Sequence, residues 1–124
     1  MKKFFTYGSI VLWYCLSSFI SADEVVSAIK NGSVSQLSKY LDNTIEITFT
    51  EKSNTYSKSQ AELVLKDFFN NNEVKGFELV HKGDNTNAQF LTGTLATNNG
   101  EYRITIYMKQ KGDKQLLQEL RFEK

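Results

Sequence analysis

Hydrophobic residues recur along this chain with two different spacings, which predict helices in its first part and a sheet in its second. The clearest helical segment covers residues 58–72. Its apolar residues lie three or four positions apart and form one broad face: Ala61, Val64, Leu65, Phe68 and Phe69. Ser57 and Gln60 form a capping box at its start, and three consecutive asparagines, Asn70 to Asn72, end it.

Two shorter helices are predicted before this segment. Apolar residues at helical spacing over residues 25–29 are followed by Asn31-Gly32, which stops the pattern. Ser33 and Gln36 then form a second capping box, and Asp42-Asn43 ends an apolar stripe made of Val34, Leu37 and Leu41. Because neither helix is long enough to be stable alone, we expect the pair to pack on the rest of the domain.

Elsewhere apolar and polar residues alternate, which predicts strands with one buried face. The first strand covers Ile45–Phe49, and the polar residues 51–56 after it predict a turn into a short second strand. From Val74 onward the pattern is that of an antiparallel sheet, with turns at Gly83-Asp84-Asn85, Asn99-Gly100 and Gly112-Asp113. Gly93 interrupts the long strand over residues 86–97 and predicts a bend or bulge, and the last strand covers Gln115–Phe122.

This order of elements resembles the cone-shaped α+β folds of the nuclear transport factor two superfamily, which also contains ketosteroid isomerase. More closely, four stretches resemble a family of short exported bacterial proteins known only as a domain of unknown function: residues 28–32, residues 56–61, Phe77 to Gly83, and residues 120–124. The resemblance implies N-terminal helices and one long helix packed on a strongly bent antiparallel sheet. It also implies an exported location, in Bacteroidetes-type bacteria, but no activity.

The first 22 residues have the pattern of a secretory signal peptide. Lys2 and Lys3 are followed by the apolar run Phe4–Ile20 and the small residues Ser21-Ala22. Cleavage after Ala22 would leave one domain over residues 23–124, located in the periplasm or outside the cell. The alternative is a retained membrane anchor, since the apolar run has about the minimum spanning length of 17 residues. Small residues rather than a basic cluster follow the run, which favours cleavage.

The composition of the mature chain excludes several function classes. Once Lys2 and Lys3 are removed, 13 Lys and Arg remain against 14 Asp and Glu, so a nearly neutral domain is not expected to bind nucleic acid. Cys15, the only cysteine, lies in the predicted signal peptide, and His81 is the only histidine. The mature chain therefore has no disulfide or thiol nucleophile, and we expect neither a metal site nor a cofactor.

No catalytic motif is present in the sequence. A catalytic triad would have to use His81, and no serine lies in a recognisable activating turn. In the superfamily that the chain resembles, isomerases use an acidic base deep in the cone. Here the alternation places the strand acids on polar, solvated faces, which counts against proton abstraction: Glu46, Glu78, Glu101 and Glu119.

Three polar side chains share predicted strand faces with apolar neighbours: His81, Tyr102 and Gln118. If the bent sheet faces a cavity, these are its hydrogen-bonding groups and the expected ligand-binding residues. The alternative is that each lies at a strand end or bonds to the backbone and only satisfies the core. Several aromatic residues are expected to face the core or to form the wall of an apolar site: Phe49, Phe68, Phe69, Phe77 and Phe90.

These observations predict an exported binding or scaffold domain without catalysis, with a small apolar molecule held in the cone as the expected ligand. The alternative function is a lyase or isomerase that acts on a small apolar substrate with His81 as the base. A homodimer formed through the sheet is a further expectation, because Tyr107 falls on a face that no helix is predicted to cover.

Overall fold

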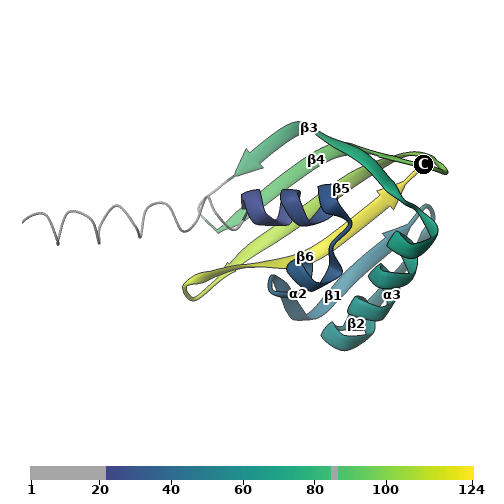
Figure 1. The fold of residues 1–124 in the computed structure, drawn as a ribbon. Helices are drawn as coiled ribbons and strands as arrows, with labels where there is room; N and C mark the ends of the chain where they lie inside the picture. The colour runs from purple at the N-terminus through teal and green to yellow at the C-terminus, as the bar shows by residue number, and fades with distance from the viewer. Residues whose placement is uncertain (1–21, 85–86) are drawn as a thin grey trace, which may run out of the picture.

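The computed structural model describes residues 22–84 and 87–124, in which three helices pack on one six-stranded sheet (Figure 1). The predicted signal peptide lies outside these residues except for Ala22. Residues 22–31 are helical and are called the first helix here; α2 (Val34–Ser38) and, after two strands, α3 (Lys58–Asn71) follow. The strands are β1 (Leu41–Phe49), β2 (Lys52–Ser57), β3 (Val74–Asp84), β4 (Ala88–Thr97), β5 (Gly100–Lys111) and β6 (Lys114–Glu123).

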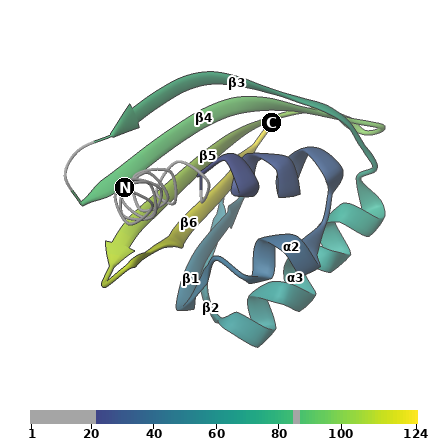
Figure 2. The same ribbon diagram turned by 60° about the vertical axis from the view of Figure 1, so that its left-hand side comes forward.

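The sheet has the strand order β2-β1-β6-β5-β4-β3. It curves around the helices, which lie on its concave side (Figure 2). The α+β class and the bent sheet expected from the sequence are therefore confirmed. One detail differs from the expectation of a purely antiparallel sheet, because β1 and β6 pair in parallel, with Ile47 opposite Leu120 and Phe49 opposite Phe122.

The core lies between the concave face and the helices. Buried apolar side chains come from every layer: Val25, Ile29, Leu37, Ile45, Ile47, Leu65, Leu91, Leu95, Ile104, Ile106, Met108, Leu117, Leu120 and Phe122. The long helix is confirmed within one residue, and both hydrogen bonds of its capping box are present. Of its predicted apolar face, Ala61, Leu65 and Phe68 are buried, whereas Val64 and Phe69 are half-buried.

The second helix is shorter than the sequence predicts. The stripe that included Leu41 was expected to be helical, but α2 ends at Ser38 and β1 begins at Leu41. The reason is pairing with the end of the chain, since the Leu117 N–H donates to the Tyr40 carbonyl at 2.6 Å and Leu41 lies opposite Leu117. A long-range ladder thus overrides a local helical pattern.

A side-chain hydrogen bond connects the first helix to Tyr40, the residue immediately before β1. The Tyr40 hydroxyl donates to the carboxylate of Glu24. Burial, together with this bond and the negative charge of Glu24, raises the pKa of Tyr40 to about 12. Tyr40 therefore stays protonated and keeps its donor role over the whole physiological pH range.

A bulge in β3 lies opposite Gly93. Leu79 pairs with Gly93 and His81 pairs with Thr92, so Val80 is an extra residue in β3. The sequence predicted a bend or bulge at Gly93 itself, in β4, whereas the bulge lies in the neighbouring strand β3. A Cβ at Gly93 would lie 2.5 Å from Cζ of Phe77, so only glycine lets the Phe77 ring cross β4 at this point.

Candidate functional site

The structure places His81 on the convex side of the sheet and leaves it exposed. The sequence put it on the apolar face with Phe77 and Leu79, and that assignment was wrong. Its partner Thr92 alternates with the buried Leu91, and paired residues of an antiparallel ladder point to the same side. The extra residue in β3 shifts the alternation by one, which turns every later side chain to the other face.

Tyr102 lies on the concave side, as the alternation with Ile104 and Ile106 predicted. Its ring meets the ring of Phe68 edge-on, with centroids 5.3 Å apart. Its hydroxyl donates to Oδ1 of Asn72 at 3.1 Å, and the same oxygen accepts from the Asn99 amide at 3.0 Å. The polar end of Tyr102 therefore joins the end of α3 to the turn between β4 and β5.

Gln118 belongs to a separate hydrogen-bond network. It falls at a second irregularity in the sheet, because Tyr107 pairs with Glu119 while Met108 pairs with Leu117. Its Nε2 donates to Oδ2 of the buried Asp42 at 2.7 Å, and Lys111 approaches the same oxygen at 2.6 Å. Hydrogen bonds from Lys111 and then from Gln118 lower the pKa of Asp42 to about 2.

The structure does not bring the three predicted residues together. Tyr102 pairs with Leu95 across β4, whereas Gln118 lies beside Tyr107 and Met108 near the other end of β5. Five or six strand residues between them correspond to about 16–20 Å. His81 is on the opposite side of the sheet. Their proposed role as one ligand-binding set therefore has no support in their arrangement.

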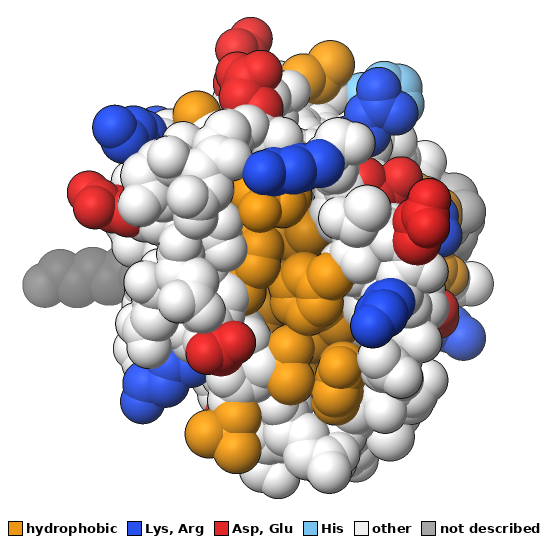
Figure 3. All heavy atoms as spheres, turned by 90° about the vertical axis from the view of Figure 1, so that its right-hand side faces the viewer, with side chains coloured by type: hydrophobic (Ala, Val, Ile, Leu, Met, Phe, Trp, Pro, Cys, Tyr) orange, Lys and Arg blue, Asp and Glu red, His pale blue; other side chains and the backbone are white. Residues whose placement is uncertain are grey.

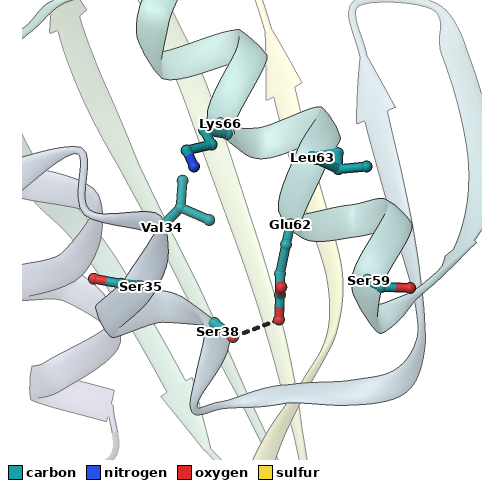
Figure 4. Close-up of a pocket in the computed structure, with 7 residues that line it drawn as sticks. All are labelled: Val34, Ser35, Ser38, Ser59, Glu62, Leu63 and Lys66. Carbon is teal, nitrogen blue, oxygen red and sulfur yellow. Dashed lines mark hydrogen bonds between the residues drawn. The ribbon is translucent and has the colours of Figure 1, made fainter.

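A groove of about 530 Å³ runs between α2 and α3 (Figure 4). Its lining is Val34, Ser35, Ser38, Ser59, Glu62, Leu63 and Lys66. The Ser38 hydroxyl donates to Oε1 of Glu62 at 2.6 Å across it, so two of its polar groups already satisfy each other. Leu63 and Ser59 point away from α2. The groove thus offers few free groups that converge on a ligand.

A cluster of aromatic rings occupies the place where α3 meets the sheet. Phe68 is at its centre, and its ring centroid lies 4.4 Å from that of Phe122 and 5.4 Å from that of Phe49. Phe49 in turn stacks on Phe122 at 5.3 Å, with an angle of 16° between the rings. We define the aromatic cluster as Phe49, Phe68, Phe69, Tyr102 and Phe122. Phe49, Phe68 and Phe69 were expected to face the core or an apolar site, and the parallel pairing of β1 with β6 brings Phe49 and Phe122 side by side.

The aromatic cluster opens to the surface in a small cavity of about 210 Å³, which we call the aromatic cleft. Its lining is Phe49, Val64, Asp67, Phe68, Asn71 and Asn72. Figure 3 views the side of the molecule on which α3 and the C-terminus lie in Figure 1. It shows hydrophobic side chains along a groove, with acidic and basic side chains on the borders. Phe49 and Val64 are half-buried here, so part of their apolar surface faces solvent.

The convex face holds the one aromatic residue that the sequence misplaced. Phe90 was expected to face the core, but it is 48% exposed, because Leu91 and Leu95 are the residues of β4 that point inward. Its ring packs on Tyr107 of β5 with centroids 4.6 Å apart. The four strand glutamates that the alternation placed on polar faces are also away from the core: Glu46, Glu78 and Glu101 are exposed, and Glu119 is half-buried beside Arg121.

Within residues 22–84 and 87–124, no group of three or more His, Cys, Asp or Glu side chains could hold a metal ion. The same part of the chain contains no helix that is long and apolar enough to cross a membrane.

A family comparison agrees with the fold. The model of the family described as "Domain of unknown function (DUF4783)" matches residues 22–123. The chain belongs to the DUF4783 family. This agrees with the resemblance that was read from four stretches of the sequence. Comparison with curated proteins gives no match.

Solved structures extend the family assignment to the fold. A DUF4783 protein from Bacteroides ovatus is 34% identical, with a TM-score of 0.80 over 82% of this chain and 92% of that one. A DUF4783 protein from Bacteroides fragilis is 33% identical, with a TM-score of 0.78 over 82% and 95%. An NTF2-like protein from Cytophaga hutchinsonii is 8% identical, with a TM-score of 0.62 over 86% and 94%. At that identity the likeness shows the fold alone, and the fold of this DUF4783 chain is NTF2-like.

Sequence reasoning missed the polar half of the aromatic cleft in this DUF4783 domain. Val64, Asp67, Phe68 and Asn71 follow the spacing i, i+3, i+4, i+7, which places them on one stripe of α3. That stripe runs along the boundary between the apolar and polar faces of the helix. A side chain on such a boundary is the kind that lines an opening, and this signal was available in the sequence.

Proposed function

We propose that this DUF4783 chain is an exported, non-catalytic binding domain that holds a small apolar group in the aromatic cleft. The observation that carries the proposal is the partial exposure of Phe49 and Val64 beside the buried Phe68, at an opening of about 210 Å³. Ligand sites are concave and mostly apolar, with a few polar groups that fix orientation. Asp67, Asn71 and Asn72 are those polar groups here.

The size of the aromatic cleft limits the ligand and its affinity. The volume suits a single ring or a short branched aliphatic group. A group that buries about 150 Å² of apolar surface gains roughly 4 kcal/mol at about 25 cal/mol per Å². Because association itself costs free energy, the dissociation constant for such a group is no lower than about 1 mM. A ligand that binds more tightly would have to contact surface beyond the residues that line the aromatic cleft.

The arrangement of acid–base groups favours binding over catalysis. A general base must lie within hydrogen-bond reach of the proton that it removes. His81, the base of the alternative lyase or isomerase function, is exposed on the convex side of the sheet and lines none of the cavities described above. Asp67 remains as a carboxylate in the aromatic cleft, without a proton donor for a developing oxyanion beside it other than the amides of Asn71 and Asn72.

Export remains part of the proposal, supported by the signal-peptide pattern over residues 1–22. We expect the protein recovered from the periplasm or the culture medium to begin at Asp23. N-terminal sequencing of that protein tests the cleavage. A mature protein that retains residues 1–22 and sediments with membranes would favour the anchor instead.

Binding is tested by NMR titration of the purified protein with toluene, a neutral probe of the right size. We expect amide shifts at Phe49, Val64 and Phe68. Val64→Phe should fill the aromatic cleft and abolish them. Leu63→Phe is the matched control, since the neighbouring residue is 69% exposed and does not line the aromatic cleft. Shifts that persist unchanged in Val64→Phe, or that are absent from the wild type, would overturn the proposal.

A further inference from the structure

Asp67 is the only charged side chain that lines the aromatic cleft. Its hydrogen-bond partner is a neutral amide, because Nδ2 of Asn71 donates to its Oδ1 at 3.4 Å and to its backbone carbonyl at 3.0 Å. The ion pairs of the described part of the chain involve Asp42, Glu119 and Glu123, and none involves Asp67. The negative charge at this side of the aromatic cleft therefore has no cation paired with it inside the described domain.

The end of α3 adds to this negative potential. A helix of 14 residues carries roughly half an elementary negative charge at its C-terminus, and the last turn of α3 contains no basic residue to offset it. Its final carbonyls are capped by amides alone. The Phe68 carbonyl accepts from the backbone N–H and Nδ2 of Asn72, and the Asn71 carbonyl accepts from Nδ2 of Asn99 at 2.6 Å. These carbonyls of α3 therefore have hydrogen-bond donors, but no cationic side chain in the last turn offsets the partial negative charge of the helix end.

Aromatic rings lie beside these negative groups. Phe49 and Phe68 line the aromatic cleft, where they stack on each other, and Phe49 also stacks on Phe122. A neighbouring ring of the aromatic cluster receives a cation, because Nζ of Lys124 lies 5.3 Å from the centroid of Tyr102. The carboxylate and the helix end thus favour a positive ligand charge, and the rings offer apolar contact beside it.

We propose that the aromatic cleft selects ligands whose small apolar group carries a positive charge, such as a methylated or alkylated ammonium. This inference rests on the proposed binding function and adds the charge of the ligand to it. The carboxylate of Asp67 pairs with the cation while its alkyl groups lie on Phe49, Phe68 and Val64. An alkyl ammonium satisfies both halves of the lining, whereas a neutral group leaves Asp67 and the helix end unpaired.

Three isosteric probes test the selection in the purified protein: choline, its neutral isostere 3,3-dimethyl-1-butanol, and the anion 3,3-dimethylbutanoate. Amide shifts in NMR titrations at low salt give the three dissociation constants. We expect choline to bind about tenfold more tightly than the alcohol, equivalent to about 1.4 kcal/mol, and the anion to bind more weakly than the alcohol. The advantage of choline should shrink as salt is added, because the site is partly exposed.

Asp67→Asn keeps the shape of the side chain and removes its charge. We expect this variant to lose most of the preference for choline and to bind the alcohol as the wild type does. Asp113→Asn is the matched control, since it makes the same charge change in the turn between β5 and β6, and it should leave both affinities unchanged.

The outcomes separate the two proposals. Equal affinity for choline and the alcohol would overturn the charge selection and leave the binding function standing. Binding of neither probe would overturn the charge selection, and the absence of shifts with toluene as well would overturn the binding function itself. A choline preference that survives in Asp67→Asn, or shifts that map outside the aromatic cleft, would show that this site is not the source of the selection.

Discussion

Replacement of Phe68 by Ala removes the ring at the centre of the aromatic cluster. Phe68 is 8% exposed, and its centroid lies within 5.4 Å of those of Phe49, Phe69, Tyr102 and Phe122. Truncating a buried Phe to Ala costs about 3–5 kcal/mol, and less where the surroundings can fill the space. Because Phe68 also borders an open cleft, water can enter the vacated volume. We therefore expect a loss of about 3 kcal/mol in the free energy of unfolding.

Urea unfolding followed by far-UV circular dichroism measures this loss. The only tryptophan, Trp13, lies in the predicted signal peptide, so tryptophan fluorescence is not a suitable probe of the mature domain. If the free energy of unfolding falls with urea concentration at the same slope in both proteins, the shift in the unfolding midpoint can be converted into a change in free energy. Leu63→Ala is the control on the same helix, because Leu63 is 69% exposed and its truncation should change stability by less than about 0.5 kcal/mol. A similarly small change for Phe68→Ala would refute the assignment of this helix face to the core.

Three further changes test other parts of the fold. Gly93→Ala should lower the free energy of unfolding by about 1–3 kcal/mol, measured as a lower melting temperature, because its Cβ would lie 2.5 Å from Phe77. Gly76→Ala is its control and should leave the melting temperature unchanged, because no atom lies within 4 Å of its Cβ. The folded-state pKa of Asp42 is lowered from 3.8 to about 2, so its contribution is present above about pH 4 and is lost as the pH falls through 2. Asp42→Asn should accordingly cost about 1–2 kcal/mol near neutral pH and little near pH 2, as chemical denaturation at the two pH values would measure. The homodimer through the sheet stays a prediction, and Phe90→Glu on the exposed convex face should shift sedimentation toward the monomer; a wild type that is already monomeric would contradict it.

Local signals were sufficient for most of the elements. The capping box at Ser57 and Gln60 placed the start of α3, and the alternation around Ile104 and Ile106 placed the inward face of β5 correctly. These features depend on residues a few positions apart, so the sequence contains everything needed to recognise them.

Features that depend on distant partners could not be recognised in the same way. The bulge at Val80 lies in β3 where this strand pairs with Gly93 of β4. No residue next to Val80 in the sequence indicates that β3 contains an extra residue there. A count of alternating positions therefore put His81 on the wrong face. Gln118 was expected in a ligand site, but its partner Asp42 lies 76 positions away and was assigned to the end of a helix.

In the candidate site, too, the residues with local signals were predicted and the contacts between distant residues were not. Phe49 and Phe68 were recognised as residues of a potential apolar wall from their type and spacing. The packing of Phe49 on Phe122 behind that wall could not be predicted, because it depends on the parallel pairing of β1 with β6. Asp67 lies on the boundary stripe of α3, which the sequence does show, but an acid at such a position is ordinary, and the rings that lie beside Asp67 are brought there by the fold.

The position of β6 in the sheet has a consequence for the order of events during synthesis. This strand is the last of the six to be made, yet it lies between β5 and β1. Until Lys114–Glu123 has emerged, β2-β1 and β5-β4-β3 are two separate pieces of sheet with no shared hydrogen bonds. Pairing across such long sequence separations also makes folding slow. The six-stranded sheet of this domain can therefore be completed only after residues 114–123 have been made, which couples its folding to the end of synthesis of the domain.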